Sequence, residues 1–75
     1  MIWFWSRANE RIQLETRFDN ASKEYVLTTR YPDDRQEFER FPDMMSFRQR
    51  LTSLERHLEA EGWVQAGRPV FESDG

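Results

Sequence analysis

Two runs of alternating side chains, joined by a short polar turn, constrain the fold of this chain more than any other feature. One face of residues 11–18 carries Ile12, Leu14, Thr16 and Phe18, and one face of residues 24–31 carries Tyr25, Leu27, Thr29 and Tyr31. Alternation with a period of two is typical of strands that are buried on one face. Between the runs, Asp, Asn, Ala, Ser and Lys occupy residues 19–23, a composition that favours a tight turn.

A single register of this hairpin satisfies all the inward positions. The expected pairs are Phe18 with Tyr25, Thr16 with Leu27, Leu14 with Thr29 and Ile12 with Tyr31. A slip of one residue would turn either inward set toward solvent, so the hydrophobic pattern itself specifies the pairing. The sequence therefore predicts an antiparallel hairpin with this register.

Two further strands are predicted with less regular patterns. Residues 2–6 form an apolar, aromatic segment that suits an extended strand. Residues 35–40 follow a Pro-Asp-Asp turn and form a weaker strand. We expect Phe38 to face the core from this strand, with Glu37 and Glu39 on the outer face near Arg30 and Thr28.

A single amphipathic helix is predicted over residues 44–61. Its narrow apolar stripe consists of Phe47, Leu51, Leu54 and Leu58. Asp43 is a candidate N-cap, Ser46 with Gln49 is a possible capping box, and Gly62 is the expected stop, with Trp63 packing back on the last turn. The helix has arginines near its N-terminus, against the usual preference, so we expect Arg48 or Arg50 to reach Glu37 or Glu39.

Together these elements predict one α+β domain over residues 1–75. Its sheet is an antiparallel meander of three to four strands, with one amphipathic helix packed across one face and an irregular tail over residues 63–75. The helix is about as long as the strands, roughly 27 Å against 26 Å. Four strands are roughly 19 Å wide, however, and one helix is only about 10–12 Å thick.

This difference in width leaves part of the sheet to be covered by something else. The candidates are Trp3, Trp5, Trp63, residues 64–71 of the tail, or a second subunit. Small domains without disulfides or metals are often stabilised by association. The sequence thus favours a homo-oligomer, most simply a dimer.

Composition narrows the classes of function. The chain has no cysteine and one histidine, His57, so disulfides and a structural zinc site are not expected. Its formal net charge of −3 argues against a protein that depends mainly on nucleic-acid phosphates. Residues 1–5 lack the basic start of a signal peptide, and no apolar run approaches the roughly 20 residues that span a bilayer. We expect a soluble, cytoplasmic protein without membrane contacts.

No set of residues predicts catalysis. Ser53, His57 and Glu61 share one helix face, but a catalytic triad converges from different elements on a pocket, so we expect a solvated surface. Glu37 with Glu39 and Asp33 with Asp34 have no visible third ligand. We therefore expect no enzyme activity, no catalytic residue, no cofactor and no metal.

Two surfaces are candidates for binding. Aromatic side chains are enriched in protein interfaces, which makes Trp3, Phe4, Trp5 and Trp63 the interface candidates. The arginines Arg11, Arg17 and Arg30 are the candidates for contact with nucleic acid. The predicted outer face of the sheet, Arg11, Gln13, Glu15, Arg17, Val26, Thr28, Arg30, Glu37 and Glu39, has mixed charge and no aromatic residue.

Residues Trp3–Trp5, 14–20, 24–27 and 31–33 resemble segments of small uncharacterised bacterial proteins of this length. That resemblance implies no activity. Separately, several strands followed by one helix is similar in order to the single-stranded-nucleic-acid-binding modules of the Whirly and PUR type. Such modules are expected to carry a basic, aromatic sheet face. Our first hypothesis is a non-catalytic, self-associating protein-interaction module, and the alternative is a single-stranded nucleic-acid binder.

Overall fold

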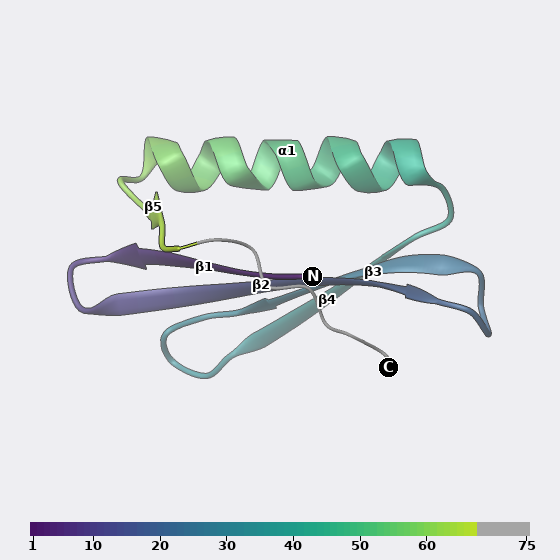
Figure 1. Cartoon of the computed structure of the whole chain (residues 1–75), viewed down its shortest axis with the longest axis horizontal. Helices are drawn as coiled ribbons and strands as arrows, with labels where there is room; N and C mark the ends of the chain where they lie inside the picture. Colours follow the sequence, from purple (N-terminus) through teal and green to yellow (C-terminus); the bar gives the residue numbers. More distant parts are fainter. Residues whose placement is uncertain (68–75) are drawn as a thin grey trace.

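The computed structural model describes residues 1–67 and has a five-stranded antiparallel sheet with one helix packed across it (Figure 1). In chain order the elements are β1 (Ile2–Arg7), β2 (Glu10–Asp19), β3 (Glu24–Arg30), β4 (Gln36–Phe41), α1 (Met44–Ala60) and β5 (Val64–Gln65). The strand order across the sheet is β4-β3-β2-β1-β5. This arrangement confirms the predicted α+β meander with one helix.

The β2–β3 hairpin has the predicted register for three of its four inward pairs. Phe18 lies opposite Tyr25, Thr16 opposite Leu27, and Leu14 opposite Thr29. The fourth pair does not form, because β3 ends at Arg30. Tyr31 instead enters the next turn, where its N–H donates to the carbonyl of Arg35 at 2.8 Å.

The core lies between α1 and one face of the sheet, which we call the inner face. From the sheet it contains Trp5, Ile12, Leu14 and Leu27, and from the helix and its C-terminal turn it contains Phe47, Leu54, Leu58 and Trp63. Leu14 and Leu27, in the two middle strands, are almost completely buried. The stripe predicted for the helix is therefore the surface that it buries.

Both ends of α1 are capped, by Asp43 and Gly62 as predicted, whereas Ser46 lies within the first turn and is not the N-cap that a capping box with Gln49 requires. The Asp43 carboxylate accepts a hydrogen bond from the Ser46 N–H at 2.7 Å, which satisfies one of the free N–H groups of the first turn. At the other end Gly62 has φ +88, a conformation that favours glycine. The N–H of Trp63 then donates to the carbonyl of Leu58 at 2.9 Å, and this Schellman turn directs the Trp63 side chain into the core.

The orientation of β4 differs from the prediction. Phe38 lies opposite Thr28, on the face away from the helix, whereas Glu39 lies opposite Leu27 and Glu37 opposite Thr29. The expected neighbours, Arg30 with Glu37 and Thr28 with Glu39, are therefore wrong. Phe38 is 64% exposed, so the expectation that it faces the core is also wrong.

Phe41 and Arg50 explain why β4 turns this way. The ring of Phe41 packs on Phe47 of the helix, with centroids 5.9 Å apart. Nε of Arg50 in α1 donates a hydrogen bond to the Glu39 carboxylate at 2.9 Å, which confirms one of the pairings expected for the arginines at the start of the helix. Within the described residues β4 pairs with β3 alone, and charged side chains that point inward on an edge strand discourage pairing with another chain.

The start of the C-terminal segment is a strand rather than an irregular tail. In β5, Gln65 lies opposite Trp5 and Val64 opposite Ser6, and the Ala66 N–H donates to the Phe4 carbonyl at 2.7 Å. The edge of β1 offers these backbone groups, and the turn at Gly62 returns the chain to them. The rest of the tail predicted over 63–75, from residue 68 onward, lies outside the described residues.

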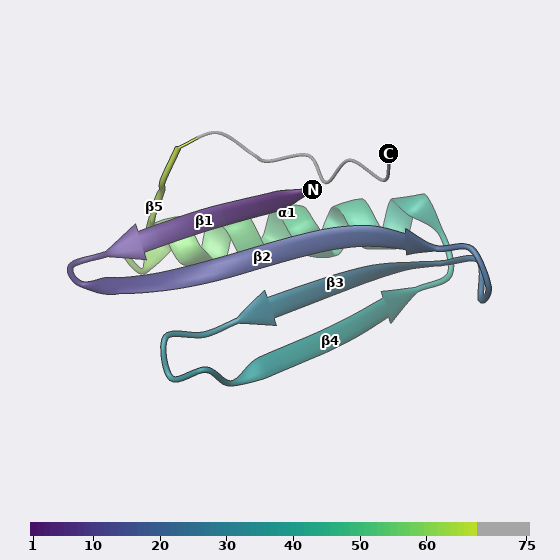
Figure 2. The same cartoon turned by 60° about the horizontal axis from the view of Figure 1, so that its bottom comes forward.

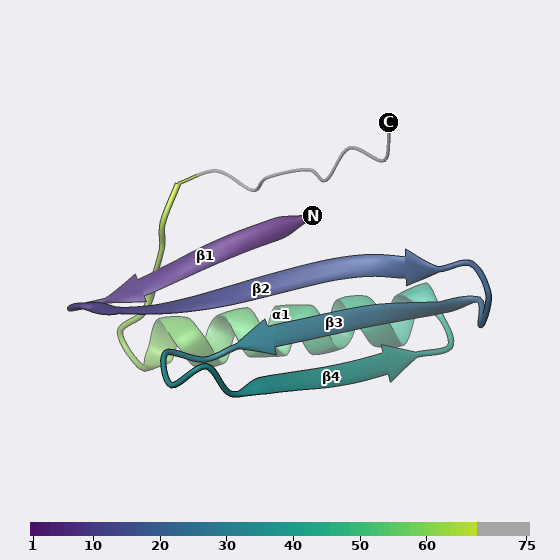
Figure 3. The ribbon, with the colours of Figure 1, turned by 90° about the horizontal axis from the view of Figure 1, so that it is seen from below.

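The helix covers one face of the sheet and leaves the other face open among the described residues. Figures 2 and 3 view the sheet from the open side, with α1 behind the strands. Figure 1 also shows that the turn between β3 and β4 lies far from the C-terminal half of α1, although β4 approaches the start of the helix. This divergence is the right-handed twist usual for sheets.

The register of β4 predicts opposite outcomes for its two phenylalanines. Phe41→Ala removes a ring packed on the helix and should lower the free energy of unfolding by about 2 kcal/mol. Phe38→Ala should change it by no more than about 0.5 kcal/mol, since the side chain is exposed. Urea denaturation followed by tryptophan fluorescence measures both values. A larger loss for Phe38→Ala than for Phe41→Ala would contradict the register.

Candidate functional site

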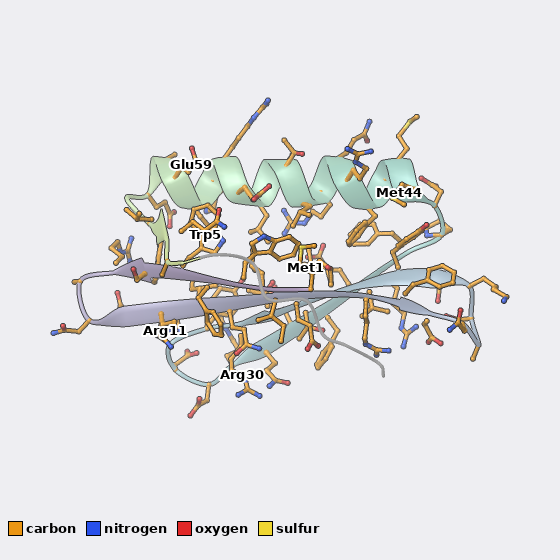
Figure 4. The ribbon with its side chains drawn as sticks, viewed as in Figure 1. Met1, Trp5, Arg11, Arg30, Met44 and Glu59 are labelled. Atoms are coloured by element: carbon orange, nitrogen blue, oxygen red, sulfur yellow. The ribbon has the colours of Figure 1, made fainter. Side chains whose placement is uncertain are left out.

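The open face of the sheet, which we call the outer face, gathers basic and aromatic side chains from β1 to β4. Its outward positions are Ile2, Phe4, Ser6, Arg11, Gln13, Glu15, Arg17, Asp19, Glu24, Val26, Thr28, Arg30, Gln36, Phe38 and Arg40. Figure 4 shows Arg11 and Arg30 pointing away from α1. Alternation along four strands thus brings residues that are distant in sequence onto one surface.

The arginines of the outer face differ in whether a carboxylate among residues 1–67 reaches them. Among residues 1–67, no carboxylate lies within ion-pair distance of Arg11, Arg17 or Arg30. The guanidinium of Arg11 lies 5.1 Å from the centroid of the Phe4 ring, a cation–π contact. Arg30 donates to the amide oxygen of Gln36 at 2.9 Å, in the orientation that satisfies the amide. In the part of the chain that the structure describes, no ion pair occupies these three guanidinium groups.

Arg40, the fourth arginine of this face, has a structural role instead. Its NH1 lies 3.1 Å from the Asp19 carboxylate and 3.5 Å from that of Glu24, so it joins β4 to the β2–β3 hairpin. The Arg40 guanidinium, with the backbone N–H of Ala21, lowers the pKa of Asp19 to about 2. Val26 lies opposite Arg17 on β2 and opposite Arg40 on β4 and is only 1% exposed. Long side chains such as these can cover apolar neighbours with their stems.

Two aromatic residues belong to the outer face, which corrects the expectation that it has none. Phe38 is largely exposed on β4, and Phe4 is partly exposed on β1. The expectation is wrong for Phe38 because the predicted strand over residues 35–40 turns Phe38 inward, and the choice between Phe38 and Phe41 depends on the helix. The spacing of three residues between them places them on opposite faces, a signal that the sequence does contain.

The four aromatic interface candidates are divided between the core and the surface. Trp5 and Trp63 are 2% and 5% exposed, and the chain's own residues cover both. Trp3 packs against the core and remains partly exposed. Phe4 points to the outer face, beside Arg11. The N-terminal tryptophans therefore help to seal the strip of sheet that the helix does not reach.

A groove opens on the inner face where the sheet twists away from the helix. It lies between the C-terminal half of α1 and the β3–β4 turn and has a volume of about 330 Å³. Buried Ile12, Thr29, Leu54 and Leu58 form its floor. The width of the sheet predicts an uncovered strip, but the sequence pattern does not identify the residues that line this groove.

The helix row of Ser53, His57 and Glu61 does not assemble a catalytic set. Nε2 of His57 lies 3.2 Å from the Glu61 carboxylate, and both side chains are well exposed. No hydrogen bond joins Ser53 to His57 within the described part of the chain. Over the same residues, no cluster of three histidine or acidic side chains is placed to hold a metal ion.

The chain was compared with family models, curated proteins and solved structures. No family model, no curated protein and no solved structure matches this chain. No helix in residues 1–67 is long and apolar enough to cross a membrane.

The Asp19–Arg40 contact predicts how stability depends on pH at one end of the outer face. The pKa of Asp19 is lowered from 3.8 to about 2 by folding, so its contribution is complete above about pH 4 and is lost as pH falls toward 2. Asp19→Asn should therefore flatten the fall in stability over this range. Arg40→Gln should flatten it as well, since it removes the main cause of the shift. An unchanged pH profile in both variants, measured by urea denaturation, would contradict this assignment.

Proposed function

We propose that this protein is a non-catalytic binding module that contacts single-stranded nucleic acid through its outer face. The observation that carries the proposal is that Arg11, Arg17 and Arg30 share an open sheet face with exposed Phe38 and partly exposed Phe4. Single-stranded nucleic acid is bound by surfaces that combine basic groups for the backbone with aromatic rings for the bases.

The distribution of charge supports an anionic ligand on this face despite the overall charge of −3. Among the outward positions of β1 to β4, Asp19 and Glu24 are paired with Arg40, and three other arginines share this face with one further carboxylate, that of Glu15. Acidic residues are numerous elsewhere, in the turns and on the helix. Local charge governs where a charged partner is attracted, so a net negative chain can bind an anion on one face.

The aromatic residues favour a nucleic acid over a simple polyanion. Phe4 and Phe38 stand on β1 and β4, three strands apart, which separates them by roughly 14 Å across the sheet. A base can stack on the exposed ring of Phe38, whereas the Arg11 guanidinium already lies over the Phe4 ring. The arginines on the two strands between these rings can contact the backbone. Stacking of one base on an aromatic side chain contributes about 1–3 kcal/mol. A dimer formed through two outer faces would instead bring the arginines of one subunit against the same arginines of the other, and these like charges repel.

Oligothymidylate binding tests this proposal. Fluorescence anisotropy at low salt should detect binding. A plot of the logarithm of the binding constant against the logarithm of the salt concentration should have a slope of about −2, because each of the three arginines contributes about −0.7. The triple variant Arg11→Gln/Arg17→Gln/Arg30→Gln should lose most of the affinity, and Phe38→Ala should weaken it by about 1–3 kcal/mol.

The matched control replaces arginines on the helix, Arg48→Gln/Arg56→Gln, and should bind as the parent protein does. Both control positions are exposed and lie outside the outer face. Absence of binding by the parent protein at low salt would overturn the proposal. Equal losses in the two sets of variants would show that binding follows total charge and not this face.

Self-association, the first hypothesis from the sequence, is supported by a separate apolar patch. Phe18, Met44 and Met45 are exposed apolar residues near the start of α1. Phe18 and Met44 line a shallow hollow of about 220 Å³ with Tyr25 and Phe47. A second copy of the chain that covers this patch would bury apolar side chains that are otherwise in water. We propose a dimer through the patch as the second candidate function.

Light scattering decides whether the patch forms a dimer. The full chain should have the mass of a dimer, and Phe18→Ser/Met44→Ser should have the mass of a folded monomer. Val64→Ser is the matched control, since Val64 is an exposed apolar residue in β5, away from the patch. A monomeric parent protein, or a variant that remains dimeric, would contradict self-association through this surface.

A further inference from the structure

We infer that the groove between α1 and the β3–β4 turn is a binding site for a small carboxylate with an apolar body. The groove is on the inner side of the sheet, opposite the outer face, so this inference is independent of nucleic-acid binding. Its volume of about 330 Å³ is at the lower end of the roughly 300–1,000 Å³ usual for ligand pockets.

The floor of the groove suits an apolar ligand. Ile12 from β2 and Leu54 and Leu58 from α1 are buried core residues whose surfaces reach the groove. Trp63 forms part of one wall. A flat hydrocarbon or aromatic body that entered here would cover the small accessible parts of these side chains and the more exposed surfaces of Tyr31 and Pro32, which also line the groove. Displacing water from this surface is favourable in proportion to the apolar area covered.

Most charged groups at the rim of the groove already have partners within the protein. Arg7 contacts the Glu10 carboxylate at 3.4 Å and donates to the Glu61 carbonyl at 3.0 Å, and its guanidinium lies 4.5 Å from the Trp63 ring centroid. The Glu61 carboxylate lies beside His57. Asp33 accepts a hydrogen bond from the backbone N–H of Arg35 at 3.0 Å.

Arg35 differs from the other charged groups at the rim. Among the described residues no carboxylate lies within ion-pair distance of its guanidinium. The guanidinium lies 4.4 Å from the centroid of the Tyr31 ring, which holds it at the groove. A planar guanidinium that is already positioned binds a carboxylate through two parallel hydrogen bonds. Arg35 therefore sets the sign of the ligand's charge.

Tyr31 is held in a fixed place beneath Arg35. Burial raises the pKa of the Tyr31 hydroxyl, and the nearby Glu37 carboxylate raises it further, so the phenol remains neutral. Its backbone N–H is bonded to the Arg35 carbonyl within the same turn. The ring and the guanidinium thus form one preorganised wall, and the apolar floor lies beside it.

Binding of phenylacetate to the full chain tests this inference, with phenylacetamide as the neutral probe of the same shape. Nitrogen-15 NMR spectra should show shifts of the Trp63 indole and the Arg35 side-chain signals on addition of phenylacetate. Arg35→Gln should weaken phenylacetate binding about tenfold or more, the loss expected for one charged hydrogen-bonding partner. Arg48→Gln, on the exposed side of the helix, should leave it unchanged.

Three results would overturn the inference. They are equal binding of phenylacetamide and phenylacetate, equal binding of phenylacetate by the parent protein and Arg35→Gln, and shifts that occur away from the groove. Arg35 is exposed in a turn, and the dispersion of each NMR spectrum reports directly whether the variant is folded. Addition of oligothymidylate should leave the phenylacetate affinity unchanged, which separates this site from the outer face.

Discussion

A single helix has to close the core of a sheet that is wider than itself, and the rest of the structure depends on this constraint. The helix lies along the middle strands, where Leu14 and Leu27 are most deeply buried. The tryptophans Trp5 and Trp63 complete the cover toward β1, and β5 extends the sheet at that edge. On the other side the sheet twists away and the groove remains. The whole outer face is left open by the described residues, so the surfaces available for binding are consequences of how the core is closed.

The charged side chains follow the same division between covered and open surfaces. At the edge of the helix, Arg50 is paired with Glu39, which allows β4 to turn carboxylates inward. At the hairpin end, Arg40 is occupied by Asp19 and Glu24. These contacts use the arginines that maintain the fold. Arg11, Arg17 and Arg30 lie on the open face with two phenylalanines, and Arg35 lies at the rim of the groove, whereas Arg48 and Arg56 are exposed on the helix. This separation is the physical basis for assigning binding roles to some arginines and structural roles to others.

The local features of this fold were predictable, and the features that depend on contacts between distant elements were only partly so. The β2–β3 register followed from alternation, and both ends of α1 followed from Asp43 and Gly62. The orientation of β4 did not, because either Phe38 or Phe41 could face inward. Contact of Phe41 with Phe47 decides between them, and it exists only once the helix is in place. The same contact places Phe38 on the outer face. The prediction that Phe38 points inward therefore also omitted an aromatic residue from the candidate site.

The central claim is that the outer face binds single-stranded nucleic acid, and the most direct measurement is an NMR titration of the nitrogen-15-labelled full chain with oligothymidylate at low salt. Side-chain signals of Arg11, Arg17 and Arg30 should shift, together with amides around Phe38, while the signals of α1 and the Trp63 indole stay in place. Such a pattern can arise only if the ligand contacts the side of the sheet opposite the helix. Shifts concentrated in α1 or in the groove, or no shifts at all, would contradict the account.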